Sequence, residues 1–577
     1  MTLVNFFKAF LSAYFLFGMH IILDTPGGTG LYLSYNIIAW LFVVMLIAFG
    51  LWQITINKKI YYSKMLIGLT LGYFCLLIPA FYHFEFTDHA IPRLLALTGG
   101  LLFLFSLYQF KFSKSEQTNM LWLIVIAVAI EASLGLAQFF IFEEGFWGGY
   151  QLGVSRPHGV FLQPNVMASF MATGLAIGLF LSVKKHKPVL PQPLLFLQQL
   201  AKPLLYFVLF SSSFLLVVLQ SRTGYIGALL VIALLLPYLY KKNRQQLAIN
   251  LLIIVLGVTS ALASFNGADL PKRDSSIYQS VGARDIIFEV SADMVITKPL
   301  VGFGYGNFER SFIDHFNQYA LINPDVGKTI ERLSHPHNEV LFWVIEGGGM
   351  ALIGFIFFTF AYINMWLKIP LTTALALLAL ILPILLHSQL EFPFYSSVSH
   401  FILFLLLLWL SDTYQQNSQE QQGLSVNLSV DCQKTFLIRF LAILAPAIFI
   451  PFLVTSIHTA YILVEHEKSD HRSVQRLKDI VNPIAWQDRL DAAVFAHILV
   501  AGIIEKKTKN LERYISWGLK RVRYKPRANI YSNMLLALKM LNKKELYELL
   551  LKEAKQTYPQ RSNWHEKVMM PERYTEF

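Results

Sequence analysis

The chain has 577 residues, of which 55% are hydrophobic and only 15% charged, with a mean hydropathy of +0.50 and a formal net charge of +12. Too few polar residues remain to cover the surface of a soluble protein of this size, which excludes an ordinary cytosolic enzyme, a disordered protein and a disulfide scaffold. The composition indicates a polytopic membrane protein. The two cysteines, Cys75 and Cys432, support neither a disulfide framework nor a cysteine-based metal site.

Thirteen apolar runs approach the length of about 20 residues that a helix needs to cross the hydrocarbon core. The first run is followed by no small-residue cleavage site, so we predict a retained span rather than a signal peptide. The sequence therefore predicts an all-α, polytopic membrane protein with about 12–13 transmembrane helices. The runs lie near residues 4–23, 36–54, 64–82, 92–110, 119–142, 166–183, 203–220, 223–240, 247–264, 338–364, 371–388, 396–412 and 435–458.

Basic residues in the short loops orient these spans. Alternation of the spans places all five basic loops on one side, which we expect to be the cytoplasm together with the N-terminus and residues 413–433. Residues 143–165, residues 265–337 and the tail after residue 458 are then periplasmic. The basic loops contain Lys58, Lys59 and Lys64, then Lys111 and Lys114, then Lys184, Lys185 and Lys187, then Lys241, Lys242 and Arg244, then Lys368, whereas the opposite loops carry Asp24, Glu85, Asp88, Glu143 and Glu144.

The tail differs in character from the rest of the chain. Residues 459–577 contain 22 Lys and Arg against 14 Asp and Glu, a net charge of +8 (22 − 14), and their apolar residues follow helical spacing. Two amphipathic stretches, 528–541 and 543–557, resemble tetratricopeptide-type helical hairpins. We predict a transmembrane catalytic domain, 1–458, and a helical C-terminal domain, 459–577. The tail is either a plain soluble appendage or a docking platform for a protein, and its charge also favours anionic lipid headgroups.

Arginines at the outer ends of the spans are informative, because ionisable groups at membrane depth are costly and usually functional. Arg222 lies in a short connection between two long apolar runs. It either snorkels at a helix end or binds a phosphate at headgroup level. Arg284 opens an amphipathic stretch, 284–297, that we expect to be interfacial. It either favours an anion at a helix N-terminus or pairs with the nearby Asp285 or Glu289.

Two histidines precede the span that begins near residue 338. They lie in Ser334-His335-Pro336-His337-Asn338-Glu339, where the proline fixes the chain before the helix. Histidine titrates near neutrality and can act as a general base. The spacing also permits a metal site, although no second Cys or His cluster supplies further ligands, and a helix cap is a third possibility. The glycine-rich segment 302–308 departs from dinucleotide-binding spacing and predicts a tight turn between short helices.

A further polar segment precedes the sixth span on the same side and contains Arg156, Gln163 and Asn165. The sequence has no Asp-x-Asp motif and no dense carboxylate cluster that would hold Mg²⁺ against a pyrophosphate. The arginine fork is a metal-free partner for phosphate oxygens. The residues therefore predict a site for a lipid-linked phosphate or pyrophosphate with a base nearby, and we expect no cofactor, no metal and no nucleic acid.

The order of these motifs resembles the O-antigen ligase family. That family includes the lipopolysaccharide O-antigen ligases and the bacterial protein O-oligosaccharyltransferases that modify pilins and other exported proteins. The resemblance covers residues 150–410 with motifs and the whole chain in architecture. It rests on Ser221-Arg222, Arg284, the glycine-rich 302–306, His335-Pro336-His337-Asn338-Glu339 and Gly347-Gly348-Gly349.

The resemblance implies a metal-independent glycosyltransferase in the bacterial inner membrane, which uses a glycan on undecaprenyl pyrophosphate at the periplasmic face. By motif position, Arg222 and Arg284 would stabilise the pyrophosphate leaving group and His337 would activate the acceptor hydroxyl. This chain has Gln163 where many relatives carry a second Asn, which leaves the role of that position open. The residues implied to line the substrate site are Arg156, Gln163, Asn165, His335, Asn338 and Glu339.

The long tail favours a protein O-oligosaccharyltransferase, because lipid A-core ligases tend to stop soon after the last span. The acceptor would be a Ser or Thr hydroxyl of an exported protein such as a pilin, and inner-membrane lipids are the other expected partner. A lipopolysaccharide O-antigen ligase and an O-antigen polymerase are the alternatives. A transporter of lipid-linked sugars is disfavoured, because the sequence shows no clear repeat and its candidate charges lie at one face.

Overall fold

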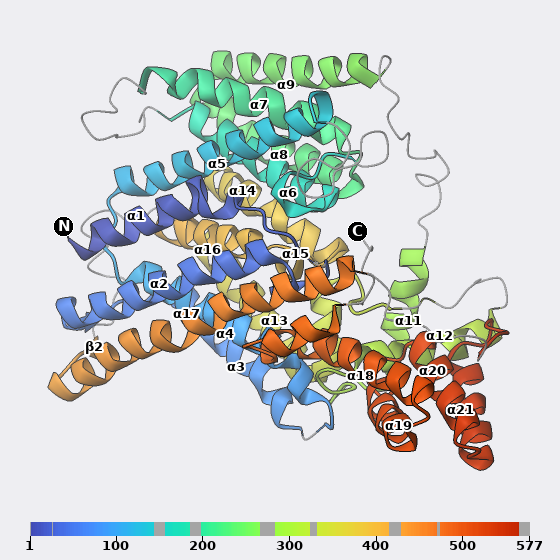
Figure 1. Ribbon diagram of the computed structural model, residues 1–577. Coiled ribbons are helices and arrows are strands. Elements are labelled where there is room, and N and C mark those ends of the chain that lie inside the picture. The colour runs from blue at the N-terminus through green and yellow to red at the C-terminus, as the bar shows by residue number, and fades with distance from the viewer. Residues whose placement is uncertain are drawn as a thin grey trace.

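The computed structural model is helical apart from one short strand pair among the residues it describes (Figure 1). The described residues are 2–25, 27–82, 84–142, 156–184, 198–265, 283–323, 330, 332–367, 369–414, 428–469 and 473–564. The helices are α1 (Leu3–Leu16), α2 (Ser34–Asn57), α3 (Lys64–Leu77), α4 (Ile91–Tyr108), α5 (Lys114–Phe140), α6 (Pro164–Ser182), α7 (Ala201–Val218), α8 (Arg222–Lys242), α9 (Arg244–Phe265), α11 (Ala283–Thr297), α12 (Phe308–Ile322), α13 (Glu339–Trp366), α14 (Leu371–Leu390), α15 (Pro393–Ser396), α16 (Val398–Thr413), α17 (Cys432–Lys468), α18 (Gln487–Ile504), α19 (Thr508–Val522), α20 (Ala528–Met540) and α21 (Lys544–Thr557).

Twelve helical segments in the described part of the chain are long and apolar enough to cross a membrane. They correspond to twelve of the thirteen predicted spans. The other prediction falls on α16, which is apolar but has only 16 residues. Ser397 caps α16, so this helix begins two residues later than predicted, and it connects the end that holds Glu391 to the end where the basic loops gather. The protein is an all-α, polytopic membrane protein.

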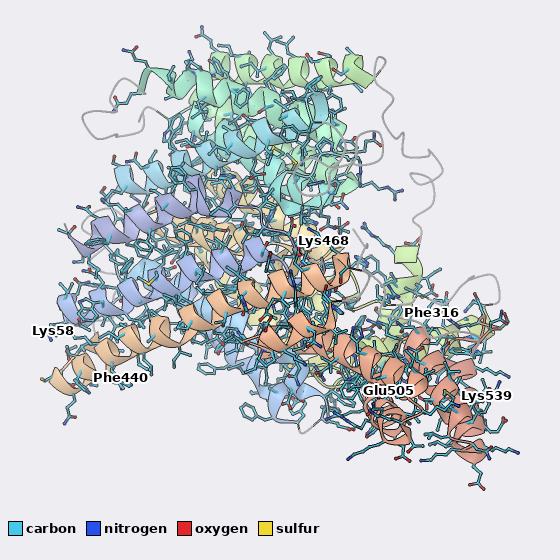
Figure 2. All side chains as sticks on the ribbon, in the orientation of Figure 1. Lys58, Phe316, Phe440, Lys468, Glu505 and Lys539 are labelled. Carbon is cyan, nitrogen blue, oxygen red and sulfur yellow. The ribbon has the colours of Figure 1, made fainter. Side chains whose placement is uncertain are left out.

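The basic loops gather at one end of the membrane helices. There β1 (Lys59–Ile60) pairs antiparallel with β2 (Leu428–Ser429), just before α17 begins. Lys114 Nζ donates to the Thr413 carbonyl at 2.8 Å, and Lys184 contacts the hydroxyl of Tyr414. Figure 2 shows Lys58 at this end and Lys468 at the opposite end of α17. The arrangement agrees with the predicted alternation. Three of the basic residues lie outside the described residues: Lys185, Lys187 and Lys368.

The tail helices build a second hydrophobic core at the other end of the molecule. Helix α17 has 37 residues, which is about 55 Å at 1.5 Å per residue and well beyond a hydrocarbon core of about 30 Å. Helices α18–α21 follow it and pack in sequential order, and they lie beside α11 and α12 (Figure 1). Tyr531, Met534, Leu535 and Leu538 of α20 are fully buried in this core. The two predicted hairpin stretches form α20 and α21.

The apolar stripe of helix α11 is buried inside the protein. Ile287, Val290 and Met294 are buried in a cluster with Phe312 of α12 and Phe342 of α13. The stripe packs against protein, and the interfacial position that we expected for this helix stays a prediction. The aromatic face of α12, a helix that periodicity had not predicted, gives the stripe a protein surface to pack against.

The glycine-rich segment between α11 and α12 is a tight turn, as predicted. Gly302, Gly304 and Gly306 all have positive φ angles, which side chains rarely adopt. A Cβ atom on Gly302 would lie 2.5 Å from the carbonyl oxygen of Glu346 in α13. The glycines therefore allow this turn to pack directly against the backbone of α13, where it supports the segment that carries the two histidines.

Candidate active site

Glu391 is the carboxylate on which several predicted site residues converge. It directly follows α14 and is only 3% exposed. Its Oε1 accepts hydrogen bonds from Arg284 Nη2 at 2.5 Å and from Asn165 Nδ2 at 2.6 Å. Its Oε2 accepts from Gln163 Nε2 at 3.2 Å and lies 3.2 Å from His387 Nε2. The start of α6, the start of α11 and the end of α14 therefore meet at one side chain.

The start of α6 places two amide side chains beside Glu391. Gln163 is the N-cap residue in extended backbone, and Pro164 takes the first helical position, where its missing N–H costs nothing. Asn165 follows in the first turn. Because α11 also begins near Glu391, two helix N-termini with their partial positive charge face this carboxylate. The site is built to hold negative charge.

Arg284 pairs with Glu391 rather than with its neighbours Asp285 or Glu289. The carboxylate of Glu289 instead accepts a hydrogen bond from Tyr319 Oη at 2.8 Å. The side chain of Arg284 is 35% exposed, whereas that of Glu391 is 4% exposed. A guanidinium has five N–H donors, so Arg284 can keep Glu391 and still offer a donor edge to a second anion.

Glu391 is an anchor for cations and amides rather than a proton carrier. Burial alone would raise the pKa of Glu391, but hydrogen bonding to His387 and the charges of His387, Arg284 and His337 lower it to about 2. The carboxylate therefore stays ionised throughout the physiological pH range. A group with so low a pKa is a poor general base.

His337 lies at the junction between the outer loop and α13. Asn338 caps this helix, since its Oδ1 accepts from the Leu341 amide at 2.8 Å, and its Nδ2 donates to the Gln389 carbonyl at 3.1 Å. His337 has a φ of +57°, a left-handed conformation that is uncommon outside glycine and that recurs at functional sites. Its Nδ1 is buried and has no hydrogen-bond partner among the described residues.

The environment of His337 keeps its imidazole neutral. Burial and the positive charge of Arg284 lower the pKa of His337 to about 4, while Glu391 acts in the opposite direction. At neutral pH the ring is unprotonated, which a general base requires. An anionic ligand bound at Arg284 would offset the charge that lowers this pKa and would make His337 a stronger base.

His335 belongs to a separate buried cluster. It is 4% exposed, and its Nε2 lies 3.4 Å from Glu339 Oε2. Glu339 also accepts hydrogen bonds from Trp343 Nε1 at 2.7 Å and Tyr395 Oη at 3.1 Å. Burial lowers the pKa of His335, against the effect of Glu339. Phe392 contacts both histidine rings, with centroid distances of 5.3 Å to His335 and 5.5 Å to His337, so one aromatic ring adjoins both clusters.

Arg222 begins α8, and Arg156, which precedes α6, reaches the turn between α7 and α8 with its side chain. Arg156 Nη1 donates to the Leu219 carbonyl at 2.6 Å, three residues before Arg222. Ser221 caps α8, because its Oγ accepts from the Gly224 amide at 3.2 Å. A Cβ atom on Gly224 would lie 2.8 Å from the Cβ of Ala168 in α6, so α8 begins beside the first turns of α6. The structure therefore places Arg222 at the same end of the helices as Glu391.

Three models of protein families match the chain. The model described as O-antigen ligase matches residues 207–358, and the model described as protein glycosylation ligase matches residues 157–181. The model described as virulence factor membrane-bound polymerase, C-terminal, matches residues 375–570.

The chain is thus similar to the O-antigen ligase family over the segments that carry the candidate site.

Each match covers one part of the candidate site. The O-antigen ligase match contains Arg222, Arg284 and His337, the glycosylation ligase match contains Asn165, and the polymerase match contains Glu391 and most of the tail. Together they support a glycosyl-transferring enzyme with a membrane ligase activity. No curated protein sequence matches the chain significantly.

Sequence reasoning missed two acidic residues. Glu391 ends an apolar run four residues after His387, and the rule that selected Arg222 would have selected it too. Glu346 lies inside a predicted span and is 2% exposed. It pairs with Arg93 Nη2 at 2.5 Å, and its Oε1 accepts from the amides of Gly306 at 3.0 Å and Phe308. This pair holds the glycine-rich turn against α13.

The described residues contain no group of three or more His, Cys, Asp or Glu side chains that could hold a metal ion. In the His335-Pro336-His337 segment, His335 faces Glu339, whereas His337 lies near Arg284. The cation beside His337 disfavours a metal ion there, because the guanidinium already supplies the positive charge.

Proposed function

We propose that the protein transfers an oligosaccharide from an undecaprenyl-pyrophosphate carrier to Ser or Thr hydroxyls of exported proteins at the periplasmic face of the bacterial inner membrane. The observation that carries this proposal is the convergence of Arg284, Asn165 and Gln163 on Glu391, beside a neutral His337. Arginine and amide donors suit a diphosphate, and an unprotonated imidazole suits a hydroxyl acceptor.

In the proposed reaction the acceptor hydroxyl oxygen attacks the anomeric carbon of the glycan. The bond from that carbon to the phosphate oxygen breaks, the hydroxyl proton passes to His337, and undecaprenyl pyrophosphate leaves. Charge builds on the leaving pyrophosphate, where Arg284 and Arg222 stabilise it, and pre-placed donors are most effective at such a site. A direct displacement of this kind inverts the anomeric centre.

The remaining predicted residues support this machinery in different ways. Asn165 and Gln163 fix Glu391, which in turn holds Arg284 in place. Asn338 fixes the backbone next to His337. Arg156 supports the turn that carries Arg222. His335 and Glu339 form the packed cluster behind the loop, so we assign them a positioning role rather than contact with substrate.

The acceptor class is the part of the proposal that needs a direct test. The glycosylation ligase match and the helical tail favour an exported protein, and the polymerase match to the tail keeps an O-antigen polymerase as the second candidate. Expression in a host that makes a lipid-linked glycan, with candidate acceptors, separates the three cases. Glycosylated protein supports the proposal, modified lipopolysaccharide core indicates an O-antigen ligase, and lengthened lipid-linked glycan indicates a polymerase.

Orientation is tested with the chain's own cysteines. Cys432 is exposed at the start of α17, at the end where the basic loops gather. A membrane-impermeant thiol reagent should label Cys432 in a Cys75→Ser background only after the inner membrane is permeabilised. A single cysteine placed at the exposed Lys539 of the tail, in a cysteine-free background, should be labelled without permeabilisation. The reverse pattern would put the tail in the cytoplasm.

A further inference from the structure

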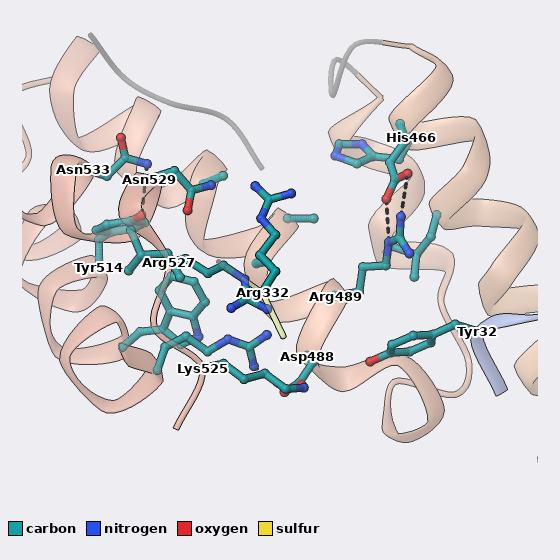
Figure 3. A pocket seen from close by; sticks show the side chains of 18 residues that line it. Tyr32, Arg332, His466, Asp488, Arg489, Tyr514, Lys525, Arg527, Asn529 and Asn533 are labelled. Atoms are coloured by element: carbon teal, nitrogen blue, oxygen red, sulfur yellow. Dashed lines mark hydrogen bonds and ion pairs between the residues drawn. The ribbon is translucent and has the colours of Figure 1, made fainter. Parts of the chain in front are cut away.

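A cavity of about 110 Å³ lies between the end of α17 and helices α18, α19 and α20, and it is lined by none of the candidate active-site residues (Figure 3). We call it the basic pocket. Its walls carry five cations and two carboxylates, an excess of three positive charges (5 − 2). The cations are Arg332, Arg489, Arg521, Lys525 and Arg527, and the carboxylates are Glu467 and Asp488.

Both carboxylates of the basic pocket are already held by cations. Arg489 forms a two-pronged pair with Glu467, with distances of 2.8 Å from Nε to Oε1 and 3.0 Å from Nη2 to Oε2. Asp488 contacts both Arg521 and Lys525. Burial would raise the pKa of Asp488, but Lys525 and Arg521 hold it well below its usual range. Arg527 contacts Glu309 of α12, so the five cations face three carboxylates in all, and an anion that enters the pocket still meets a net positive charge.

The basic pocket also contains a hydrogen-bond acceptor, Asn529, that a donor on the ligand could satisfy. Asn529 lies in the first turn of α20, and its Oδ1 is buried without a hydrogen-bond partner among the described residues. Asn533 follows one turn later, and its Nδ2 donates to Tyr514 Oη at 3.1 Å. Phosphate and carboxylate groups at neutral pH only accept hydrogen bonds, whereas a peptide backbone also supplies N–H groups. Cations together with an unfilled amide acceptor fit a ligand that carries both acidic groups and N–H donors, as an acidic peptide does.

The basic pocket is close to the candidate active site along the chain. Arg332 projects between the α17–α18 side and the α19–α20 side of the pocket (Figure 3). It precedes His337 by five residues, which span at most about 17 Å when fully extended. The volume of about 110 Å³ has room for about four water molecules at about 30 Å³ each, which suits side-chain carboxyls but not a folded domain or an oligosaccharide.

We infer that the basic pocket binds a carboxylate-bearing, extended segment of the acceptor protein, a few residues from the hydroxyl that receives the glycan. The cations hold the acidic side chains, and Asn529 accepts from the backbone of the bound segment. The pocket thereby brings the acceptor hydroxyl to His337. This inference rests on the proposed function, because it assumes a protein acceptor.

The test uses the full-length enzyme in zwitterionic nanodiscs with a glycan on undecaprenyl pyrophosphate. Three amidated peptides share one serine in a Gly-Ala context and carry two Glu, two Gln or two Lys residues five positions away. We expect a KM about tenfold lower for the Glu peptide than for the Gln peptide, with similar kcat values, and the weakest binding for the Lys peptide. Equal KM values for the three peptides would overturn the inference.

Variants then locate the preference in the pocket. Arg332→Gln and Lys525→Gln should each reduce the preference for the Glu peptide severalfold through KM, while kcat for the Gln peptide stays within about twofold of the wild type. Lys539→Gln is the matched control, because Lys539 is an exposed cation at the far end of α20 (Figure 2). An unchanged preference in both pocket variants, or an equal loss in the control, would contradict the inference.

Two further measurements separate this inference from the proposed function. If no peptide receives glycan, the protein-acceptor proposal fails, and binding of a fluorescent Glu peptide to wild-type and Arg332→Gln enzyme tests the pocket directly. If Arg332→Gln weakens binding of the Glu peptide, the result supports the pocket by itself, whereas no binding to the wild type would overturn the inference.

Displacement of the Glu peptide is then attempted with phosphatidylglycerol vesicles. Variants that lose vesicle binding but keep peptide binding would make the pocket a lipid site and refute the peptide assignment.

Discussion

Asp488 in the tail and Glu391 in the candidate active site are both carboxylates that pair with arginine, but their other partners differ. Asp488 in the tail is clamped by Arg521 and Lys525, which are 12% and 31% exposed at their side chains. Glu391 is held by a single arginine, two amides and a histidine, and that arginine is 35% exposed. At Asp488 the two cations outnumber the carboxylate, which leaves positive charge for a peptide in the basic pocket. A carboxylate whose arginine also faces outward leaves that arginine able to bind a ligand.

The largest expected effect falls on His337, the proposed base. His337→Ala should lower transfer to both protein and peptide acceptors by about 10²–10⁴-fold, because the hydroxyl loses its base. Binding of the lipid-linked donor should persist through the arginines. His335→Ala is the matched control and should be milder, since His335 packs in the Glu339 cluster. Paired donor-binding and transfer assays on purified variants measure both, and full transfer by His337→Ala would remove the base assignment.

Substitutions that keep the charge of the arginines should come next. Arg284→Lys and Arg222→Lys lose the fork that matches phosphate oxygens, and each should lower transfer by about 10²–10³-fold at normal membrane levels. Lys539→Gln serves as the control, because Lys539 is an exposed cation outside both sites and its loss should leave transfer unchanged. Wild-type rates in both Arg284→Lys and Arg222→Lys would show that these residues do not stabilise the pyrophosphate.

Replacing Glu391 or Asp488 with its neutral amide tests the difference between the two carboxylates directly. Glu391→Gln should reduce kcat/KM about tenfold, because Arg284 loses its anchor.

Activity of the wild type should fall as pH drops through the pKa of His337, about 4 in the free enzyme. Glu391 raises that pKa, so the acidic limb of the kcat/KM profile should move to lower pH in Glu391→Gln.

The matched variant is Asp488→Asn. It should leave the pH profile unmoved and cost about 2 kcal/mol of stability, seen as a lower melting temperature, because two cations lose their partner. A shifted pH profile in Asp488→Asn, or an unshifted one in Glu391→Gln, would remove the distinction between the two carboxylates.

The wild type and Glu391→Gln should differ in how their free energy of unfolding depends on pH below about pH 5. The folded-state pKa of Glu391 is about 2, below the ordinary value of about 4, so its contribution to stability is present above about pH 4 and is lost as pH falls towards 2. Glu391→Gln should therefore flatten the stability of the enzyme over this interval. Melting temperatures of both proteins between pH 5 and pH 2, at about 0.5-unit steps, measure the difference.

The smallest expected effect is that of a chelator. EDTA should leave transfer unchanged, because arginines rather than a divalent ion hold the pyrophosphate in the proposed mechanism. Activity lost in EDTA and restored by a divalent ion would revive the metal interpretation of the His335-Pro336-His337 segment.

The membrane helices were predictable from the sequence because an apolar run of sufficient length is a local property. The prediction was less complete at α11, whose stripe meets a partner helix that local spacing does not reveal. Arg284 and His337 were found by motif. Glu391 could have been selected by its place at the end of an apolar run, but its pairings could not be predicted, because it lies 107 residues from Arg284 and 226 from Asn165.

The two histidines show where sequence reasoning ends. Both have the same chemistry, and the choice of His337 rested on its position in the motif. The structure separates them through backbone and packing: His337 has a left-handed φ of +57°, and His335 is buried against Phe342. One sign was available beforehand, since Glu339 follows His335 by four residues across a predicted helix start.

The guanidinium of Arg489 limits how the tail can be exchanged between related proteins to change the acceptor. Arg489 joins the tail to α17 through Glu467 and to the N-terminal loop through the Gly27 carbonyl, 3.0 Å from its Nη1, and Lys468 of α17 reaches Asp24 of the same loop. A tail grafted from a relative at the end of α17 would leave these ties unmatched. The exchangeable unit is therefore discontinuous in sequence, and chimeras should carry residues 24–32 together with the tail.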